Sequence, residues 1–479
     1  MTKKVRKSTR MNILFIYPVP PQRFVPRGFS HGIGSMSAML KRAGHTTELL
    51  YIDSLDEAEL ARRITSSTSL VAVSATTDQF ALAKQVIDWI NKRFDIPVVL
   101  GGVHATVAPE EAIQIEGLLG ICVGEGDEAI VELAQALDLH EDVSRIRNFW
   151  FRKGATVIRN EVRPLVRDLD LLPFPDRSIF DYQAILDLNY QDGAEFMVGR
   201  GCPFHCAFCI NKKLQDLYRD KGPFVRFRSV ANVIAEIKAV TNAYTNIRKI
   251  TFQDDILGLN KAWLAEFSAH YRREIRIPFR CNIRADGVNE VILSLLKQAG
   301  CAELWVGVEC GNEILRNSLL NKQIPTQTII NAFRLIRSFN IASKAFNMIG
   351  LPGETRRNIE ETFQLNKTIK PDIRSVTIFR PYPGTALYDY CAERKWISNR
   401  SVSGYWEESI LDQPTLSRED TYFYQLLFYY EMKYPALAGL MRRLNRIKIL
   451  PGLTLFRLFH NKAIMYRLYT CMRKSGRTI

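Results

Sequence analysis

Short apolar runs alternate with amphipathic segments along the first 140 residues. Apolar runs with the length of buried strands occupy residues 13–17, 47–52, 70–74, 96–100 and 120–123. Between them, residues 35–43, 80–93 and 127–137 place apolar side chains at helical spacing, and the first of these segments ends at Gly44, a residue that commonly terminates helices. This alternation predicts an α/β domain with a parallel, doubly wound sheet. Such sheets bind ligands at the carboxyl ends of their strands.

A second series of strands and helices begins near residue 195. Its apolar runs lie at residues 196–199, 249–253, 278–283, 303–309, 343–349 and 375–380. Six strands with intervening helices predict a partial (βα)6 barrel, in which the chemistry sits at the C-terminal ends of the strands. Pro164, Pro173 and Pro175 favour extended backbone between the two series. We therefore expect domains at 11–140 and 194–392, a linker at 141–193, and a mainly helical extension at 393–479.

Length and composition agree with a globular chain of two or three domains. The 479 residues are 47% hydrophobic and 24% charged. The net charge of +15 belongs to the ends: residues 1–10 carry five bases, residues 433–479 carry eleven, and neither segment contains an acid. Removing these sixteen bases leaves a net charge of −1. The body of the chain therefore does not resemble a basic nucleic-acid-binding protein, and no nucleic-acid partner is expected.

The cysteines are crowded rather than evenly paired. Three of the nine fall within eight positions, which favours a metal site over a disulfide framework. The start of the chain lacks the features of a signal peptide, and no run of roughly 18 apolar residues is present. These features predict a reducing, cytoplasmic location.

The crowded cysteines are Cys202, Cys206 and Cys209, directly after the first strand of the second series. Three thiolates on one short loop can ligate three corners of a [4Fe–4S] cube, leaving the fourth iron open to a substrate or cofactor. A structural zinc site is the alternative. Zinc normally takes four ligands in paired spacings, and His205 does not complete such a set.

The Cys-x-x-x-Cys-x-x-Cys loop, with Phe208 before its last cysteine, resembles the radical S-adenosylmethionine superfamily. The resemblance implies that the open iron chelates the amino and carboxylate groups of S-adenosylmethionine. One electron, from a donor of the flavodoxin or ferredoxin type, would then cleave the sulfonium and give a 5′-deoxyadenosyl radical.

The resemblance extends along the predicted barrel, where each strand end carries a residue of interest. It implies that Asp254 and Asp255 hold the methionine amino group, and that Arg284 pairs with a substrate carboxylate. It further implies that Glu309 binds the ribose hydroxyls or the amino group, and that Gly353 and Glu354 belong to a turn that contacts adenine. Each residue taken singly has a structural alternative: a helix cap, a buried ion pair or an ordinary turn.

The first domain resembles the cobalamin-binding domain that is fused to one large branch of this superfamily. Two signatures match, and they supply the residues Ser74, Thr76, Gly101 and Gly102. The alternative is a flavodoxin-like domain that binds no cofactor. A further signature of such domains, Asp-x-His-x-x-Gly, is absent, and Phe29 stands where its histidine would fall. The resemblance then implies a cobalt without a lower imidazole ligand, and we interpret the nearby His31 as a loop residue.

For this branch the resemblance implies methylation of an unactivated carbon. A 5′-deoxyadenosyl radical would abstract a substrate hydrogen, and methylcobalamin would deliver the methyl group. The alternatives are a radical cyclisation or rearrangement without methyl transfer, and a non-catalytic iron–sulfur or corrinoid sensor.

The predicted radical methylation assigns no role to the basic C-terminus. Residues 440–449 and 453–468 mix large apolar side chains with arginine and lysine. Such a helical pair is typical of a segment that lies on anionic membrane, which would suit a lipid substrate, and equally of a helical cap packed on the barrel. The bases could instead hold an anionic small-molecule substrate. We therefore expect a small-molecule or lipid substrate, and possible peripheral membrane contact on the cytoplasmic face.

Overall fold

The computed structural model describes residues 10–19, 28–188, 193–398 and 409–446. The chain divides into two compact units. The first comprises residues 1–204, 209–254 and 382–384, and the second comprises residues 205–208, 255–381 and 385–479. This division separates the loop around Cys206 from its neighbours in sequence. The predicted domain boundaries stay a prediction.

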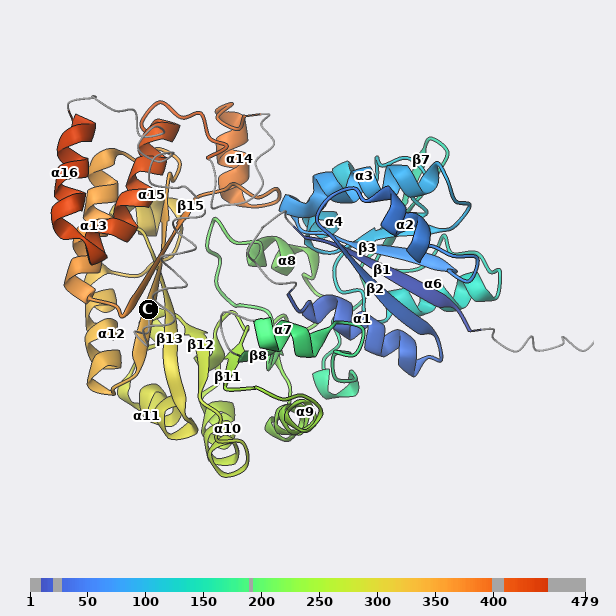
Figure 1. Ribbon diagram of the computed structural model, residues 1–479, viewed down its shortest axis with the longest axis horizontal. Coiled ribbons are helices and arrows are strands. Elements are labelled where there is room, and N and C mark those ends of the chain that lie inside the picture. The colour runs from blue at the N-terminus through green and yellow to red at the C-terminus, as the bar shows by residue number, and fades with distance from the viewer. Residues whose placement is uncertain (1–9, 20–27, 189–192, 399–408, 447–479) are drawn as a thin grey trace, which may run out of the picture. The chain divides into compact units, whose positions relative to one another are not determined.

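The first unit contains a seven-stranded sheet in the order β2-β1-β3-β4-β5-β6-β7 (Figure 1). Five strands pair in parallel, and they confirm the predicted α/β sheet: β1 (Asn12–Pro18), β2 (Thr46–Ile52), β3 (Leu70–Ser74), β4 (Val98–Gly101) and β5 (Gly120–Cys122). Two further strands, β6 (Phe149–Lys153) and β7 (Thr156–Arg159), add an antiparallel hairpin at one edge. The hairpin lies in the segment that we expected to be a plain linker. Its turn is at Gly154, whose φ of +61° suits glycine.

Helices cover this sheet and supply its core. They are α1 (His31–Arg42), α2 (Glu57–Arg63), α3 (Phe80–Asn91), α4 (Val103–Val107), α5 (Pro109–Ala112) and α6 (Ala129–Asp138). Helix α1 begins four residues before the predicted start because the Ser30 side chain caps it, accepting a hydrogen bond from Ile33 N. The apolar face of α3 buries Val86, Ile87 and Ile90 against the sheet residues of the same core. Because β1 to β5 are parallel, their carboxyl ends, which carry the candidate residues, lie at one edge of the sheet.

The rest of the first unit leads into the second βα series. It contains α7 (Tyr182–Leu188), β8 (Gly193–Phe196), β9 (Gly199–Arg200), α8 (Asn211–Leu217), β10 (Arg226–Phe227), α9 (Val230–Ala243) and β11 (Lys249–Phe252). Helix α7 is a further departure from the predicted extended linker. Strand β9, immediately before the three-cysteine loop, forms a short antiparallel pair with β10, which follows the loop and α8. The predicted first strand is thus divided into β8 and β9.

A six-stranded sheet has the order β15-β14-β13-β12-β11-β8 and confirms the predicted half-barrel. Its remaining strands are β12 (Phe279–Ile283), β13 (Cys301–Glu309), β14 (Ala342–Ile349) and β15 (Ile373–Ile378). Helices α10 (Lys261–Glu274), α11 (Glu290–Ala299), α12 (Thr326–Ser338) and α13 (Arg356–Ile369) alternate with them. In β14 the buried Ala345 and Ile349 alternate with the half-buried Lys344 and Phe346, as expected for a strand with two different faces.

The described part of the C-terminal region is helical: α14 (Ala386–Glu393), α15 (Arg418–Lys433) and α16 (Pro435–Arg446). Ala438 and Met441 of α16 belong to the same buried cluster as Phe423 and Leu427 of α15 and Phe363 of α13. These three helices lie side by side in the second unit (Figure 1). Most of the amphipathic pair predicted at 440–468 falls outside the described residues. Within the described part of the chain, no helix is long and apolar enough to cross a membrane.

Candidate cofactor sites

The carboxyl ends of β3 and β4, with the residues just after them, carry the side chains and glycines predicted to face cobalamin: Ser74, Thr76, Gly101 and Gly102. The two strand ends are in direct backbone contact, because Ala75 N donates to Gly101 O across 3.1 Å and continues the pairing of β3 with β4. Gly102 has a φ of +92°, and a Cβ atom there would lie 2.7 Å from Ala75 O and 2.8 Å from Ala75 N. Only glycine fits this approach. The edge is open to a ligand, since Ser74 and Gly101 are half-buried and Thr76 and Gly102 are exposed.

The position where a cobalt-binding histidine would fall is filled by an aromatic cluster. The ring of Phe29 lies 4.8 Å from that of Phe180 and 4.8 Å from the imidazole of His31. His31 is the first residue of α1 rather than a loop residue, and its Nε2 is buried without a hydrogen-bond partner among the described residues. Burial, together with the positive charge of Arg177, lowers the pKa of His31 to about 3. His31 is therefore a neutral packed side chain at physiological pH.

The first and last cysteines of the three-cysteine loop lie in the first unit. Gly201, just before Cys202, has a φ of +89°, and a Cβ atom there would lie 2.3 Å from Phe224 O. Cys202 is buried, and its carbonyl accepts a hydrogen bond from Gln215 Nε2 across 2.7 Å. The Cys209 sulfur accepts from Asn211 Nδ2 across 3.4 Å. The backbone leading into the loop is thus held in one conformation.

Cys206 lies in the second unit beside two cations. Arg284 Nη1 donates to the Cys206 sulfur across 3.7 Å. Burial raises the pKa of the Cys206 thiol, whereas the charges of Lys322 and Arg284 act to lower it. Positive charge beside a cysteine favours the thiolate, the form that ligates a metal.

Arg284 and Glu309, predicted at the ends of β12 and β13, are joined by a residue that sequence reasoning missed. Arg284 Nη2 donates to the backbone carbonyl of Lys322 across 2.9 Å, and Lys322 Nζ lies 2.6 Å from Glu309 Oε1. Arg284 also binds Asp286 through distances of 2.8 and 3.0 Å. Glu309 has a φ of +64°, which is uncommon for this residue type and marks a strained strand end.

The sequence around Lys322 gives little sign of its role. Its neighbours Asn321 and Gln323 have φ values of +50° and +55°, and a short π-helix at Leu315–Leu319 precedes them. Such irregular helical turns are frequent at functional sites. No sequence pattern in this segment predicts one. The segment also binds the cysteine loop: Asn321 Nδ2 donates to His205 O and Ala207 N donates to Leu320 O, each across 2.9 Å.

Asp254 and Asp255, predicted to hold the methionine amino group, have different surroundings. The Asp254 carboxylate is buried and accepts hydrogen bonds from the backbone N–H groups of Val198 and Gly199 at 2.7 to 3.1 Å. It therefore fixes the strand that leads into the cysteine loop. Asp255 is exposed.

Glu354, predicted in the turn after β14, closes that turn. Its Oε2 accepts from Gly350 N across 2.6 Å and from Leu351 N across 3.1 Å, and its Oε1 is buried without a partner among the described residues. Burial raises the pKa of Glu354 to about 8, although these backbone hydrogen bonds act to lower it. Gly353 has a φ of +75° and donates its N–H to Gln413. With its pKa at about 8, the Glu354 carboxyl group is largely protonated at neutral pH.

The donor set fits a cluster better than a single metal ion. The eight cysteines in the described part of the chain form no disulfide with one another. Among the described residues, no group of three or more His, Cys, Asp or Glu side chains has the arrangement that one metal ion needs. A cube binds each cysteine through a different iron, so its ligand sulfurs stand further apart than those around one zinc ion.

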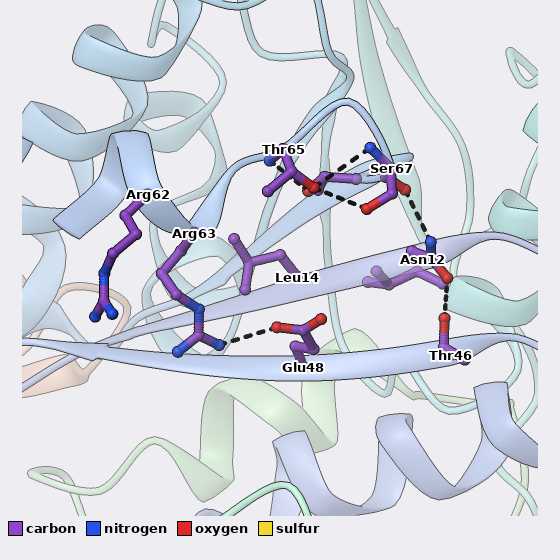
Figure 2. A pocket seen from close by; sticks show the side chains of 10 residues that line it. Asn12, Leu14, Thr46, Glu48, Arg62, Arg63, Thr65 and Ser67 are labelled. Atoms are coloured by element: carbon purple, nitrogen blue, oxygen red, sulfur yellow. Dashed lines mark hydrogen bonds and ion pairs between the residues drawn. The ribbon is translucent and has the colours of Figure 1, made fainter. Parts of the chain in front are cut away.

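A separate pocket of about 310 Å³ lies at the amino ends of β1 and β2 (Figure 2). Its polar groups bind one another: Arg63 Nη2 lies 3.1 Å from Glu48 Oε2, and Asn12 Nδ2 donates to Ser67 O across 3.0 Å. In a parallel sheet this end is opposite the carboxyl edge where ligands bind. The pocket is therefore not part of the candidate cofactor sites.

Comparison with known proteins finds two family models along the chain. Residues 196–365 match the model of the radical SAM superfamily, and residues 25–134 match that of the B12 binding domain. An uncharacterized methyltransferase of Pyrococcus horikoshii is 29% identical over 79% of this chain and 83% of its own length. The anaerobic magnesium-protoporphyrin IX monomethyl ester cyclase of Cereibacter sphaeroides is 25% identical, over 74% of this chain and 59% of the cyclase.

A solved structure shares the fold along most of the chain. The radical S-adenosylmethionine methyltransferase TsrM of Kitasatospora setae, with cobalamin and a [4Fe–4S] cluster bound, superposes with a TM-score of 0.66 and 17% identity, covering 86% of this chain and 79% of TsrM. The two family matches lie on the two sheets whose strand ends carry the candidate residues. The chain belongs to the B12-binding radical SAM enzyme family, and its cofactors are a [4Fe–4S] cluster, S-adenosylmethionine and cobalamin.

Proposed function

We propose that this enzyme methylates an unactivated carbon of its substrate. The observation that carries the proposal is the close approach of the carboxyl ends of β3 and β4, which suits a cobalamin-binding edge of the kind that methyl transfer from methylcobalamin requires. The relative from Pyrococcus horikoshii, which aligns with four-fifths of the chain, is named a methyltransferase and supports the same reading. When bound, the cofactors supply a radical that abstracts hydrogen and a transferable methyl group.

The chain's own residues hold and orient these groups. Cys202, Cys206 and Cys209 ligate the cluster. Arg284 and Glu309 are proposed to bind S-adenosylmethionine through its charged groups, with Asp254 and Asp255 contributing at the neighbouring strand end. The turn containing Gly353 and Glu354 bounds the adenine side.

The residues proposed to bind cobalamin belong to the seven-stranded sheet of the first unit. Ser74 and Thr76 offer hydroxyl groups, and Gly101 and Gly102 allow the backbone to approach the cofactor closely. The protein's contribution is binding, orientation and exclusion of competing reactions, as for other cofactor enzymes.

A cyclisation is the second candidate, because the relative from Cereibacter sphaeroides is named a cyclase. Product analysis separates the two. Reconstituted protein is incubated with S-adenosylmethionine carrying a deuterated methyl group and with a low-potential reductant. Formation of S-adenosylhomocysteine, up to one equivalent per bound cobalamin, together with 5′-deoxyadenosine supports methyl transfer. 5′-Deoxyadenosine without S-adenosylhomocysteine supports cyclisation or rearrangement, and the absence of both products contradicts each enzymatic proposal.

The proposed partners are a reductant of the flavodoxin or ferredoxin type and a small-molecule or lipid substrate. Residues 447–479 carry seven bases and no acid, which suits an anionic membrane surface or an anionic substrate. Helix α16 has a different role. Arg442 forms ion pairs with Glu360 and Glu431, so this base is used inside the second unit. The proposed location remains the cytoplasm, with peripheral contact on the cytoplasmic face of the membrane as its possible extension.

A further inference from the structure

Arg200 binds two acidic residues of the loop that follows β5. Arg200 is in β9, two residues before Cys202. Its Nη1 lies 2.8 Å from Asp127 Oδ2 and 3.0 Å from Glu125 Oε2, and its Nη2 lies 3.1 Å from Asp127 Oδ1. The guanidinium group therefore joins the strand leading into the cysteine loop to the carboxyl end of a strand in the cobalamin-domain sheet.

A second arginine completes the arrangement. Arg226 lies opposite Arg200 in the β9–β10 pair. It forms an ion pair with Glu125, which it contacts through both carboxylate oxygens, and it donates to Val166 O across 2.8 Å. Two guanidinium groups thus face two carboxylates, and the four charges balance. Paired and hydrogen-bonded charges are the form in which ionised groups persist in a protein interior.

The carboxylate of Asp127 is held in the ionised form at a defined position. The Ser35 hydroxyl, from α1, donates to its Oδ1. Burial would raise the pKa of Asp127, but the charge and hydrogen bonds of Arg200, with the Ser35 hydroxyl, keep that pKa below its ordinary value. The loop after β5 is also fixed by the Tyr218 hydroxyl, which accepts from Glu125 N across 2.5 Å.

Strand β9, which carries Arg200, is also constrained by hydrogen bonds and close packing. The Asp254 carboxylate binds the N–H groups of Val198 and Gly199, and Arg228 N donates to Val198 O across 2.8 Å. Gly201 has no room for a Cβ atom. Strand and loop are each held by contacts of their own, and the ion pairs of Arg200, together with those of Arg226, bridge the two elements.

We propose that Arg200 is a positioning residue that fixes the strand leading into the cysteine loop against the loop after β5, at the carboxyl edge of the cobalamin-domain sheet, and so sets how efficiently the two cofactors work together. The proposal rests on the proposed methyl transfer for its activity readout, but its spectroscopic readout needs only the two bound cofactors. A displacement of about 1 Å can cost two orders of magnitude in a reaction that depends on orientation.

The test compares Arg200→Gln and Arg200→Lys with a matched control. Arg442→Gln removes a guanidinium that also bridges two carboxylates, those of Glu360 and Glu431, and its side chain is 23% exposed against 26% for Arg200. Each protein is reconstituted with cluster and cobalamin, and iron and cobalt contents are measured first. Electron paramagnetic resonance then reports the magnetic coupling between cob(II)alamin and the reduced cluster in the same molecule.

We expect the Arg200 variants to retain both cofactors while their coupling spectrum differs from that of the wild type. Their ratio of S-adenosylhomocysteine to 5′-deoxyadenosine should fall on the order of tenfold, and the lysine variant should recover part of the loss. Arg442→Gln should leave both readouts unchanged. A wild-type coupling spectrum in a fully loaded Arg200→Gln protein would overturn the proposal, as would an equal change in the control.

Two further outcomes are distinguishable. If Arg200→Gln does not fold, Ser35→Ala replaces it, because that change removes one hydrogen bond to Asp127 and no charge. A smaller shift of the coupling spectrum in the same direction supports the proposal, and a wild-type spectrum contradicts it. If the wild type forms no S-adenosylhomocysteine, the proposed methyl transfer fails, whereas the spectra still decide the role of Arg200.

Discussion

Lys322 Nζ lies 2.6 Å from the carboxylate of Glu309 at the end of β13, and the two side chains are only 6% and 12% exposed. Lys322→Met would leave a nearly buried carboxylate without its cation. Breaking such a pair costs about 3 to 5 kcal/mol of unfolding free energy, more than replacing both partners does. We therefore expect Lys322→Met to destabilise the protein strongly in chemical denaturation.

The double variant Lys322→Met/Glu309→Gln is the control. It should recover at least half of the lost stability, because it removes the unpaired charge. Binding of S-adenosylmethionine, measured by calorimetry, should remain weak in the double variant if Glu309 contacts the ligand. Full recovery of stability and of binding would show that Glu309 has only a structural role.

Glu354 should make stability depend on pH. Its pKa is about 8 in the folded protein and 4.5 ordinarily, so between these values the folded chain keeps a proton that the unfolded chain has released. The unfolding free energy contributed by this group therefore falls as pH rises, by up to about 1.4 kcal/mol per pH unit in that window. Glu354→Gln should remove this loss.

The measurement is denaturant unfolding of wild type and Glu354→Gln at pH 5, 6.5 and 8. The variant should gain stability over the wild type as pH rises. Glu393→Gln, which changes a carboxylate that is 76% exposed, should show a nearly constant difference. A constant difference for Glu354→Gln as well would mean that its carboxyl group is ionised in the folded protein.

The packing of His31 against Phe29 predicts that no histidine of this region ligates the cobalt. Because the imidazole is buried against aromatic rings, cob(II)alamin bound to the protein should show no nitrogen superhyperfine splitting from a histidine. Splitting that disappears in His31→Ala would contradict this prediction. His104→Ala serves as the comparison, since His104 is another buried imidazole near the same strand ends.

The C-terminal bases should bring the protein to anionic vesicles if they serve as a membrane contact. Residues 447–479 contain seven bases, each contributing on the order of 1 kcal/mol near such a surface. Truncation after Arg446 keeps Ala438 and Met441 in the core and should fold. Co-sedimentation should rise with anionic lipid, weaken with salt and be lost in the truncated protein. Equal binding by a folded, truncated protein would exclude the segment as the membrane contact.

The sequence was most informative where pattern and position coincide. Six apolar runs predicted the six strands of the half-barrel, and Ser74, Gly101 and Gly102 were found at the adjacent carboxyl ends of β3 and β4. The contacts of Lys322 could not be predicted, because they depend on an irregular turn. This turn brings the Lys322 side chain to Glu309 and its carbonyl to Arg284. The β6–β7 hairpin was missed for another reason: prolines further along the segment favoured an extended linker, although Phe149 to Phe151 and Gly154 read as strand and turn.

The structural alternatives raised for single motif residues also proved instructive. Asp254 binds backbone N–H groups of the neighbouring β8–β9 segment, and Glu354 binds one at the end of its own strand, β14. A sequence motif cannot distinguish a residue that shapes a site from one that touches the ligand, since both are fixed at the same position. Geometry makes the distinction possible, and for these two carboxylates it shows at least the shaping role.

The most direct test of the central claim is cleavage of S-adenosylmethionine by the three-cysteine site. Anaerobically reconstituted protein should hold about four irons per chain and form 5′-deoxyadenosine with a low-potential reductant. The triple variant Cys202→Ala/Cys206→Ala/Cys209→Ala should lose both, whereas Cys391→Ala, a buried cysteine in α14, should keep both. A triple variant that retained the cluster and still produced 5′-deoxyadenosine would contradict the account.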